Sequence, residues 1–164
     1  PGGGAGIERG SVGYEITIRE LEPELLASVR VTAHMKQMGQ VMSREFGHVM
    51  AVMSRQDVKP TGGAVAVYHS FTPDTADLEI GFTAGGVMKE EDGVGPGMLP
   101  GGPVAFTVYV GAYEEIEPAY RAMQRYAEEK ELELQPVMWE KYLTGPEEPD
   151  LSKHVTEIYW PLKV

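Results

Sequence analysis

The chain has 164 residues, a formal net charge of -11 and a hydrophobic content of 42%. This length supports one globular domain with a sizeable core, and the acidic balance argues against the phosphate backbone of a nucleic acid as a partner. The absence of cysteine excludes disulfides, a thiolate nucleophile and zinc–thiolate sites. No apolar run is long enough to span a membrane and no secretion leader is recognisable, so we expect a cytoplasmic protein.

The first elements expected are a linker, two strands and a helix. Residues 1–13 are rich in glycine and are expected to form a flexible linker or a cloning remnant. Alternation with period two predicts strands over 14–19 and 25–33. A helix is predicted over 36–55 because apolar residues recur at steps of three and four, namely Met35, Met38, Met42, Phe46, Val49 and Met53.

Two more strands and a long glycine- and proline-rich stretch follow this helix. The strands are predicted over 64–71 and 77–83, with a turn at Pro73 and Asp74 between them. Residues 85–103 are expected to form a loop, and the length of this loop makes it a boundary between two halves of the chain.

The second half of the chain is expected to contain three strands and one helix. A strand is predicted over 104–110, and two further strands over 136–143 and 155–162. The helix is predicted over 118–130, with an apolar stripe made of Ala119, Ala122, Met123, Tyr126 and Ala127.

The two halves repeat one order of elements, which is strand, helix, strand, strand. Residues 64–71 align without a gap on 136–143, and 78–82 align on 156–160. We therefore predict an α+β fold built from two duplicated units and an additional N-terminal strand. The units are expected to be related by pseudo-two-fold symmetry around a central ligand cleft.

The predicted boundaries follow from this repeat. A single domain is expected over 14–164, with a first repeat over about 24–84, a linker over 85–103 and a second repeat over about 104–162.

Side chains alternate along a strand, so each strand has an apolar face and a second face. The apolar faces are expected to pack under the helices. The second faces are predicted to gather tyrosines and carboxylates, namely Tyr68, Tyr109, Glu140, Tyr142, Glu157 and Tyr159. Such a surface suits a cleft for an aromatic cation, because rings offer stacking and cation–π contacts. The alternative is that the tyrosines are amphipathic residues at the rim of a sheet.

Three segments resemble one known family. Trp139–Thr144 (WEKYLT) and Thr156–Leu162 (TEIYWPL) resemble the C-terminal signature of the GyrI-like small-molecule-binding domain, and Gly111–Tyr120 (GAYEEIEPAY) resembles the entry into its second helix. The resemblance covers nearly the whole chain. It implies an effector-binding domain of multidrug-sensing transcription regulators, or a stand-alone protein, and no helix-turn-helix segment is recognisable here.

The resemblance also implies which residues bind the ligand. The acid of the family's cleft matches Glu140, and its aromatic positions match Tyr113, Tyr142 and Tyr159. Glu140 either faces the cleft or pairs with Lys or Arg across the sheet. Glu157 is either a second acid or a residue that hydrogen-bonds to the backbone and holds the two halves together. The other expected contacts are Tyr68, Tyr109, Met138, Trp139, Met38 and Met42, and methionine is equally typical of a core.

Two functions are consistent with these residues. The first is the binding of lipophilic, planar, often cationic small molecules, with possible fusion to a separate DNA-binding domain. The second, which the family also includes, is hydrolysis of reactive cyclopropane-type compounds, with Glu140 as general base and Tyr113 or Tyr142 as proton donor. The four histidines have no metal-binding spacing, so we expect neither a metal nor a cofactor.

Overall fold

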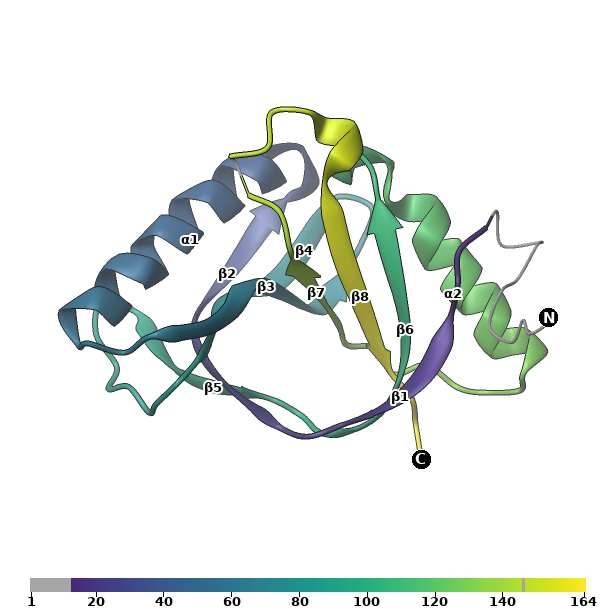
Figure 1. Ribbon diagram of the computed structural model, residues 1–164, viewed down its shortest axis with the longest axis horizontal. Helices are drawn as coiled ribbons and strands as arrows, with labels where there is room; N and C mark the ends of the chain where they lie inside the picture. Colours follow the sequence, from purple (N-terminus) through teal and green to yellow (C-terminus); the bar gives the residue numbers. More distant parts are fainter. Residues whose placement is uncertain (1–12, 146) are drawn as a thin grey trace. The chain divides into compact units, whose positions relative to one another are not determined.

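Within residues 13–145 and 147–164, which the computed structural model describes, the chain forms eight β-strands and two α-helices (Figure 1). The elements fall into two compact units. One spans Glu22–Gly101, and the other comprises Gly102–Val164 and the described residues before Glu22. We refer to them as the α1 unit and the α2 unit, after the helix that each contains.

The α1 unit is a four-stranded antiparallel sheet with one helix, and its strands lie in the order β3-β4-β2-β5. In chain order its elements are β2 (Glu24–His34), the 3-10 turn η2 (Met35–Gln37), α1 (Met38–Arg55), β3 (Pro60–Phe71), β4 (Thr75–Ala84) and β5 (Val94–Leu99).

The α2 unit also consists of four antiparallel strands and one helix, and its strands lie in the order β1-β6-β8-β7. In chain order its elements are β1 (Thr17–Leu21), β6 (Gly102–Val110), the 3-10 turn η3 (Tyr113–Glu115), α2 (Glu117–Glu129), β7 (Met138–Tyr142), the 3-10 turn η4 (Leu151–Lys153) and β8 (Val155–Pro161).

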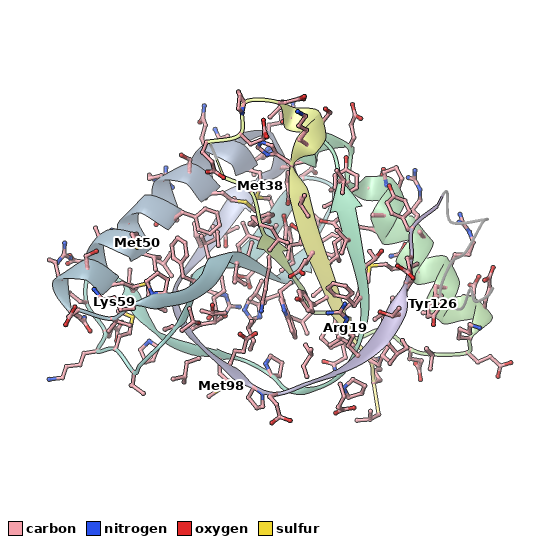
Figure 2. The ribbon with its side chains drawn as sticks, in the orientation of Figure 1. Arg19, Met38, Met50, Lys59, Met98 and Tyr126 are labelled. Atoms are coloured by element: carbon pink, nitrogen blue, oxygen red, sulfur yellow. The ribbon has the colours of Figure 1, made fainter. Side chains whose placement is uncertain are left out.

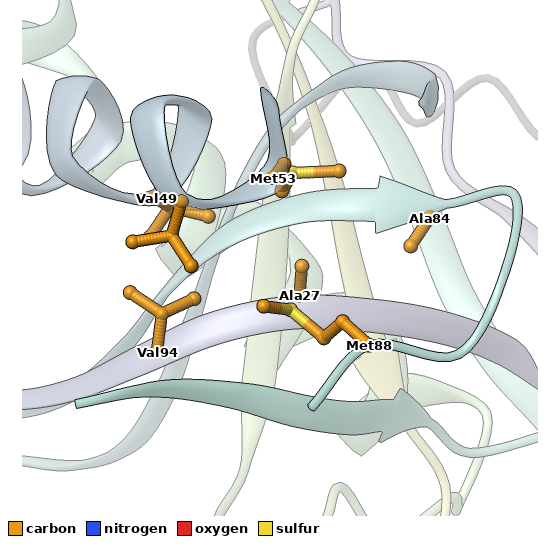
Figure 3. Close-up of a cluster of buried hydrophobic side chains, with 7 residues drawn as sticks. Ala27, Val49, Met53, Ala84, Met88 and Val94 are labelled. Carbon is orange, nitrogen blue, oxygen red and sulfur yellow. The ribbon is translucent and has the colours of Figure 1, made fainter. Parts of the chain in front are cut away.

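The core of the α1 unit forms where α1 packs on its sheet. Figure 3 shows apolar side chains from α1 meeting side chains from β2, β4, β5 and the segment that leads to β5. The cluster consists of Ala27, Val49, Val52, Met53, Ala84, Met88 and Val94. Fully burying a side chain of the size of Val or Met contributes about 1.5–3 kcal/mol, so this cluster fixes the helix on the sheet.

The apolar stripe predicted for the second helix is confirmed. The buried residues of α2 are Ala119, Ala122, Met123, Tyr126 and Ala127. The predicted first helix is confirmed from Met38 onward, because its first residues form the 3-10 turn η2 instead.

Both helices end in the same way. After α1, Asp57 has a φ of 58°, and the amide of Val58 donates to the carbonyl of Met53 at 2.9 Å. After α2, Glu131 has a φ of 58°, and the amide of Leu132 donates to the carbonyl of Ala127 at 2.8 Å. This is the Schellman motif, with an acidic residue at the left-handed position that glycine usually occupies.

The prediction that residues 85–103 form a loop is wrong. Within this stretch Val94–Leu99 forms β5, an edge strand paired with β2. An edge strand tolerates Pro96, because one row of its amides needs no partner. A Cβ at Gly97 would lie 2.5 Å from a carboxylate oxygen of Glu79, so the end of this side chain would have to move. The residues that resemble a linker in sequence thus form an edge strand.

The strand orders of the two units correspond element by element. In each unit the strand that follows the helix lies at one edge, and a strand from outside the repeated segment lies at the other edge. β5 is thus the counterpart of β1. The duplication, the pseudo-two-fold symmetry and the central cleft remain predictions. The flexible N-terminal linker predicted over residues 1–13 falls mostly on residues 1–12, which lie outside the described residues.

Candidate functional site

Glu140 on β7 has none of its surface exposed to solvent. Its Oε1 accepts hydrogen bonds from the hydroxyl of Tyr142 at 2.6 Å and from the hydroxyl of Tyr113 at 3.1 Å. Its Oε2 accepts a hydrogen bond from the hydroxyl of Tyr120. The predicted alternative, an ion pair with Lys or Arg, is not found among the described residues. Glu140 is therefore a buried acid with neutral partners.

The three tyrosines reach Glu140 from three different elements. Tyr142 follows it on the same face of β7, Tyr113 lies in η3 and Tyr120 lies in the first turns of α2. The rings of Tyr113 and Tyr142 meet edge to face, with centroids 5.8 Å apart. This tyrosine cage, defined as Tyr113, Tyr120 and Tyr142, ties β7 to the start of α2.

A tight turn places η3 against the sheet. The hydroxyl of Tyr109 on β6 donates to the carbonyl of Ala112 at 2.6 Å. Gly111 has a φ of 147°, and a Cβ at this position would lie 2.8 Å from the Tyr109 hydroxyl. Tyr109 and Gly111 thus shape the turn that leads into Tyr113. Tyr109, predicted as a ligand contact, has this structural role in the described contacts.

Tyr120 is a site residue that the sequence analysis does not predict. The predicted apolar stripe of its helix omits Tyr120, although Ile116, Tyr120, Met123 and Ala127 recur at steps of four, three and four. Its ring also meets Trp160 of β8 edge on, with centroids 6.3 Å apart. The helical period was the signal that could have identified Tyr120.

Burial dominates the electrostatics of this carboxyl. Loss of hydration raises the pKa of Glu140 above its ordinary value, since burial disfavours the charged form. Hydrogen bonds from Tyr120, Tyr142 and Tyr113 favour the charged form and offset only part of this increase in the pKa. The carboxyl therefore gains stabilisation from either a proton or a cation.

The prediction that Glu140, Glu157 and Tyr159 share one sheet face is wrong. In the register of β7 and β8, Glu140 lies opposite Ile158, whereas Tyr159 lies opposite Trp139. Alternation then puts Glu140 and Tyr142 on one face and Glu157 and Tyr159 on the other. We call the first of these the Glu140 face.

The prediction that the apolar parity packs under the helices is also wrong for β6. Val108 and Val110 are 40% and 60% exposed, whereas Thr107 and Tyr109 on the other parity are buried. The helix α2 lies on the Glu140 face, as the bond from Tyr120 to Glu140 shows. Polar groups can be buried on this face because hydrogen bonds satisfy them. The hydroxyl of Thr107, for example, donates to the carbonyl of Glu15 at 2.8 Å.

The opposite face carries an aromatic row, defined as Phe106, Tyr159 and Trp139 on β6, β8 and β7. Tyr159 stacks nearly parallel to Trp139, and the Tyr159 hydroxyl donates to Glu157 at 2.8 Å. Arg19 of β1, labelled in Figure 2, places its guanidinium carbon 3.6 Å from the centre of the Phe106 ring. The row is therefore held by stacking and cation–π contacts.

The other predicted contacts divide between the units. Met138 is buried two residues before Glu140 and shares its parity on β7. Tyr68, Met38 and Met42 are buried within the α1 unit, and their share in a site with Glu140 remains a prediction.

The α1 unit has a polar hollow of its own. Its volume is about 300 Å³, and its lining includes Ser28, Arg30, Glu79 and Glu90. Ser28 and His69 each contact one carboxylate oxygen of Glu79, at 2.6 and 2.9 Å. No aromatic residue lines this hollow, so its chemistry does not suit a lipophilic ligand and differs from that of the tyrosine cage.

Two searches of the described residues gave no candidate. No group of three or more His, Asp or Glu side chains in the described part of the chain is arranged to hold a metal ion. No helix there is long and apolar enough to cross a membrane.

The sequence of the chain matches a known family of small-molecule-binding domains. Residues 14–163 match the GyrI-like small molecule binding domain. The chain belongs to this family. A search of the curated proteins gave no match, so the detailed comparison rests on solved structures.

Several solved structures share the fold of this chain. The C-terminal domain of EcmrR superposes with a TM-score of 0.80 at 18% identity, covering 92% of this chain and 98% of that one. In an EcmrR–DNA complex the TM-score is 0.81, and this chain spans only 57% of the length of the matched chain.

Two further relatives differ in what they are described to do. SAV2435 bound to tetraphenylphosphonium matches with a TM-score of 0.63 at 15% identity, covering 91% of this chain and 94% of that one. A hydrolase encoded by lin2189 from Listeria innocua matches with a TM-score of 0.62 at 13% identity, covering 90% and 91%. At these identities the likeness establishes the fold alone.

Proposed function

We propose that this GyrI-like domain binds lipophilic, planar, often cationic small molecules, and that Glu140 neutralises their charge. The observation that carries the proposal is a carboxyl with no exposed surface whose described partners are three hydroxyls. A cation that reaches such a group is attracted strongly, because the low dielectric of the interior screens the charges little. The tyrosine rings add cation–π contacts.

Ligand entry requires a tyrosine to move, since Glu140 has no exposed surface. Tyr113 is best placed to do so. Its bond to Glu140 is longer than that of Tyr142, at 3.1 Å against 2.6 Å, and it lies in a short turn beside the exposed residues Glu114 and Glu115. The ligand then replaces the hydroxyl of Tyr113 at Oε1 and contacts the ring of Tyr142.

The structural relatives support a regulatory setting. One neighbour is described as SAV2435 bound to tetraphenylphosphonium, a lipophilic cation, and another is EcmrR in complex with DNA. We propose that the chain serves in the cytoplasm as an effector-binding module of multidrug type. DNA contact would then come from a fused or separate domain, because a net charge of -11 repels a phosphate backbone.

The expected affinity follows from the area that such a ligand buries. About 300 Å² of apolar surface at about 25 cal/mol per Å² gives roughly 7 kcal/mol before the losses of binding are counted. Immobilising the ligand and moving Tyr113 reduce this gain, and the charge of Glu140 restores part of it. We therefore expect dissociation constants on the order of micromolar.

A titration of two ligands tests the charge role of Glu140. Glu140→Gln is expected to weaken tetraphenylphosphonium by about tenfold or more, because the amide supplies no charge, and to leave neutral triphenylphosphine oxide nearly unchanged. Intrinsic tryptophan fluorescence reports both titrations at pH 8. Glu157→Gln is the matched control, because this carboxylate lies on the opposite face. An equal loss for both ligands would show that Glu140 has no charge role.

Hydrolysis of a reactive electrophile is the second candidate, and the structural likeness to a Listeria innocua hydrolase favours it. Glu140 would act as general base on water, since a raised pKa suits that role. Tyr113 or Tyr142 would donate a proton to the activated oxygen. Incubation with a cyclopropane-type electrophile separates the two functions, because only hydrolysis yields a water adduct that Glu140→Gln abolishes.

A further inference from the structure

The tyrosine cage surrounds the carboxyl of Glu140 with hydroxyl groups that carry no positive charge. A buried carboxylate needs a cation or an exceptional set of donors, because losing its hydration costs several kcal/mol. Glu140 has three hydroxyl donors and, among the described residues, no cationic partner. Binding a cation therefore replaces whatever neutralises this carboxyl when no ligand is present.

We propose that Glu140 carries a proton while the site is empty and releases this proton to solvent when a cationic ligand binds. The step exchanges one positive charge for another. The Glu140 O–H bond breaks, its electron pair remains on the carboxylate, and the proton passes to water or buffer while the cation takes its place. This inference rests on the proposed binding of cations at Glu140 and adds proton exchange to it.

The hydrogen bonds indicate which oxygen holds the proton. Oε1 already accepts two hydroxyls, from Tyr113 and Tyr142, whereas the one described partner of Oε2 within residues 13–145 and 147–164 is the hydroxyl of Tyr120. A protonated carboxyl has one donor and a tyrosine hydroxyl also accepts. A proton on Oε2 is thus donated to the Tyr120 oxygen without losing either bond at Oε1.

The residues that share the face of Glu140 on β8 and β6 are neutral. Register places Ile158 of β8 beside Glu140 and Thr107 of β6 beside Ile158. The nearest charged residues along β7 and β8, Lys141 and Glu157, lie on the opposite face by strand alternation.

The charged residues of η3 and of the first turns of α2 are exposed to solvent. Glu114, Glu115, Glu117, Arg121 and Arg125 are exposed. Arg121 pairs with Glu117 at 2.9 Å. The exchange is therefore governed by Glu140 and its tyrosine cage.

Proton exchange gives the site a preference that depends on pH. Below the pH at which Glu140 ionises in the empty protein, each cation bound releases one proton, so its dissociation constant rises about tenfold for each unit that the pH falls. A neutral ligand leaves the proton in place, and its affinity stays constant. One site thus accepts neutral molecules at low pH and favours cations at high pH.

Calorimetry measures the released proton directly. Tetraphenylphosphonium has no ionisable proton of its own, so a dependence of the binding enthalpy on the ionisation enthalpy of the buffer counts protons lost by the protein. We expect the number of protons released per cation to fall from close to one toward none as the pH rises, measured in paired buffers across a pH series. Triphenylphosphine oxide is expected to release none.

Two variants locate the source of the proton. Tyr142→Phe removes a bond that favours the charged form, and is expected to move the midpoint of proton release to higher pH. Tyr126→Phe removes a hydroxyl from the same unit that is outside the tyrosine cage, and is expected to leave the midpoint unmoved. A purely structural role for Tyr142 would alter affinity without shifting this midpoint.

The outcomes separate the inference from the function beneath it. Cation binding that depends on Glu140 but releases no proton at any pH would overturn proton exchange and leave the proposed function standing. Failure of the wild-type protein to bind tetraphenylphosphonium at any pH would overturn both. Proton release that persists in Glu140→Gln would assign the proton to another group and overturn the inference.

Discussion

At the scale of the residue, the chemistry of Glu140 was predictable from the sequence and its surroundings were predictable only in part. A glutamate between Trp139 and Tyr142 on an apolar strand indicated a carboxyl reserved for a special partner. The structure brings Tyr142 and Tyr113 onto it, together with Tyr120. The partner when no ligand is bound is a set of hydroxyls, which no sequence spacing specifies.

The face on which each residue lies required the strand register. The alternation of side chains within β7 and within β8 is visible in the sequence. Relating the faces of the two strands requires their register, in which Glu140 pairs with Ile158. Because side chains alternate, a difference of one residue moves every side chain of a strand to the other face. Sequence alternation alone therefore groups Glu157 and Tyr159 with Glu140, although they lie on the other face of the sheet.

Burial of Glu140 predicts an unusual dependence of stability on pH. Its pKa is raised in the folded protein above the ordinary value of 4.5, so the folded state binds more protons than the unfolded state between these two values. The free energy of unfolding then falls as pH rises through this window, by about 1.4 kcal/mol per pH unit at most. The stabilisation is complete below pH 4.5 and is lost above the raised pKa.

Urea unfolding of paired variants isolates this contribution. The free energy of unfolding of Glu140→Gln minus that of the wild type is expected to become more positive as pH rises, since the carboxyl of the wild type titrates and the amide does not. Glu157→Gln, measured across the same range, controls for the loss of one carboxylate from the neighbouring strand. A difference for Glu140→Gln that stays flat between pH 5 and 9 would show that the carboxyl is not buried as described.

At the scale of the element, periodicity predicted both helices and seven of the eight strands of the described residues. These elements carry a local signal, because each has an apolar side with period two or 3.6. β5 carries none, since its residues Val94–Leu99 include two glycines and a proline. Its pairing with β2 depends on contacts distant in the chain, and only the structure reveals it.

The shared helix ends predict two stabilising substitutions. Asp57 and Glu131 both have a φ of 58°, and a left-handed conformation costs a residue with a Cβ about 1–2 kcal/mol. Glu131→Gly is expected to raise the free energy of unfolding by about 1 kcal/mol, and Asp57→Gly by less, because aspartate tolerates this conformation better.

Thermal or urea unfolding checks the prediction at each helix end. Glu131→Ala is the matched control, since it removes the same carboxylate and keeps the Cβ. An equal gain from alanine and glycine would attribute the effect to charge instead of backbone conformation.

At the scale of the whole molecule, the sequence predicted two units with one helix each, and the structure describes two such units. The strand that precedes each predicted repeat pairs with the first strand of the other repeat, β1 with β6 and β5 with β2. This exchange leaves no trace in local periodicity, because it is a property of long-range pairing.

The charge of the whole chain suits the proposed ligand. A net charge of -11 raises the local concentration of cations around the protein, and salt weakens this effect. In the proposed function, this general attraction selects for charge, and the tyrosine cage around Glu140 selects for an aromatic or lipophilic molecule.

The most direct measurement is the infrared difference spectrum of the protein with and without tetraphenylphosphonium, recorded below the pH at which proton release reaches its midpoint. The wild type is expected to show a protonated carboxyl band that disappears when the cation binds, with a carboxylate band in its place. Glu140→Gln is expected to show neither band change, and Glu157→Gln to behave as the wild type. A bound cation that leaves every carboxyl band of the wild type unchanged would contradict the placement of its charge at Glu140.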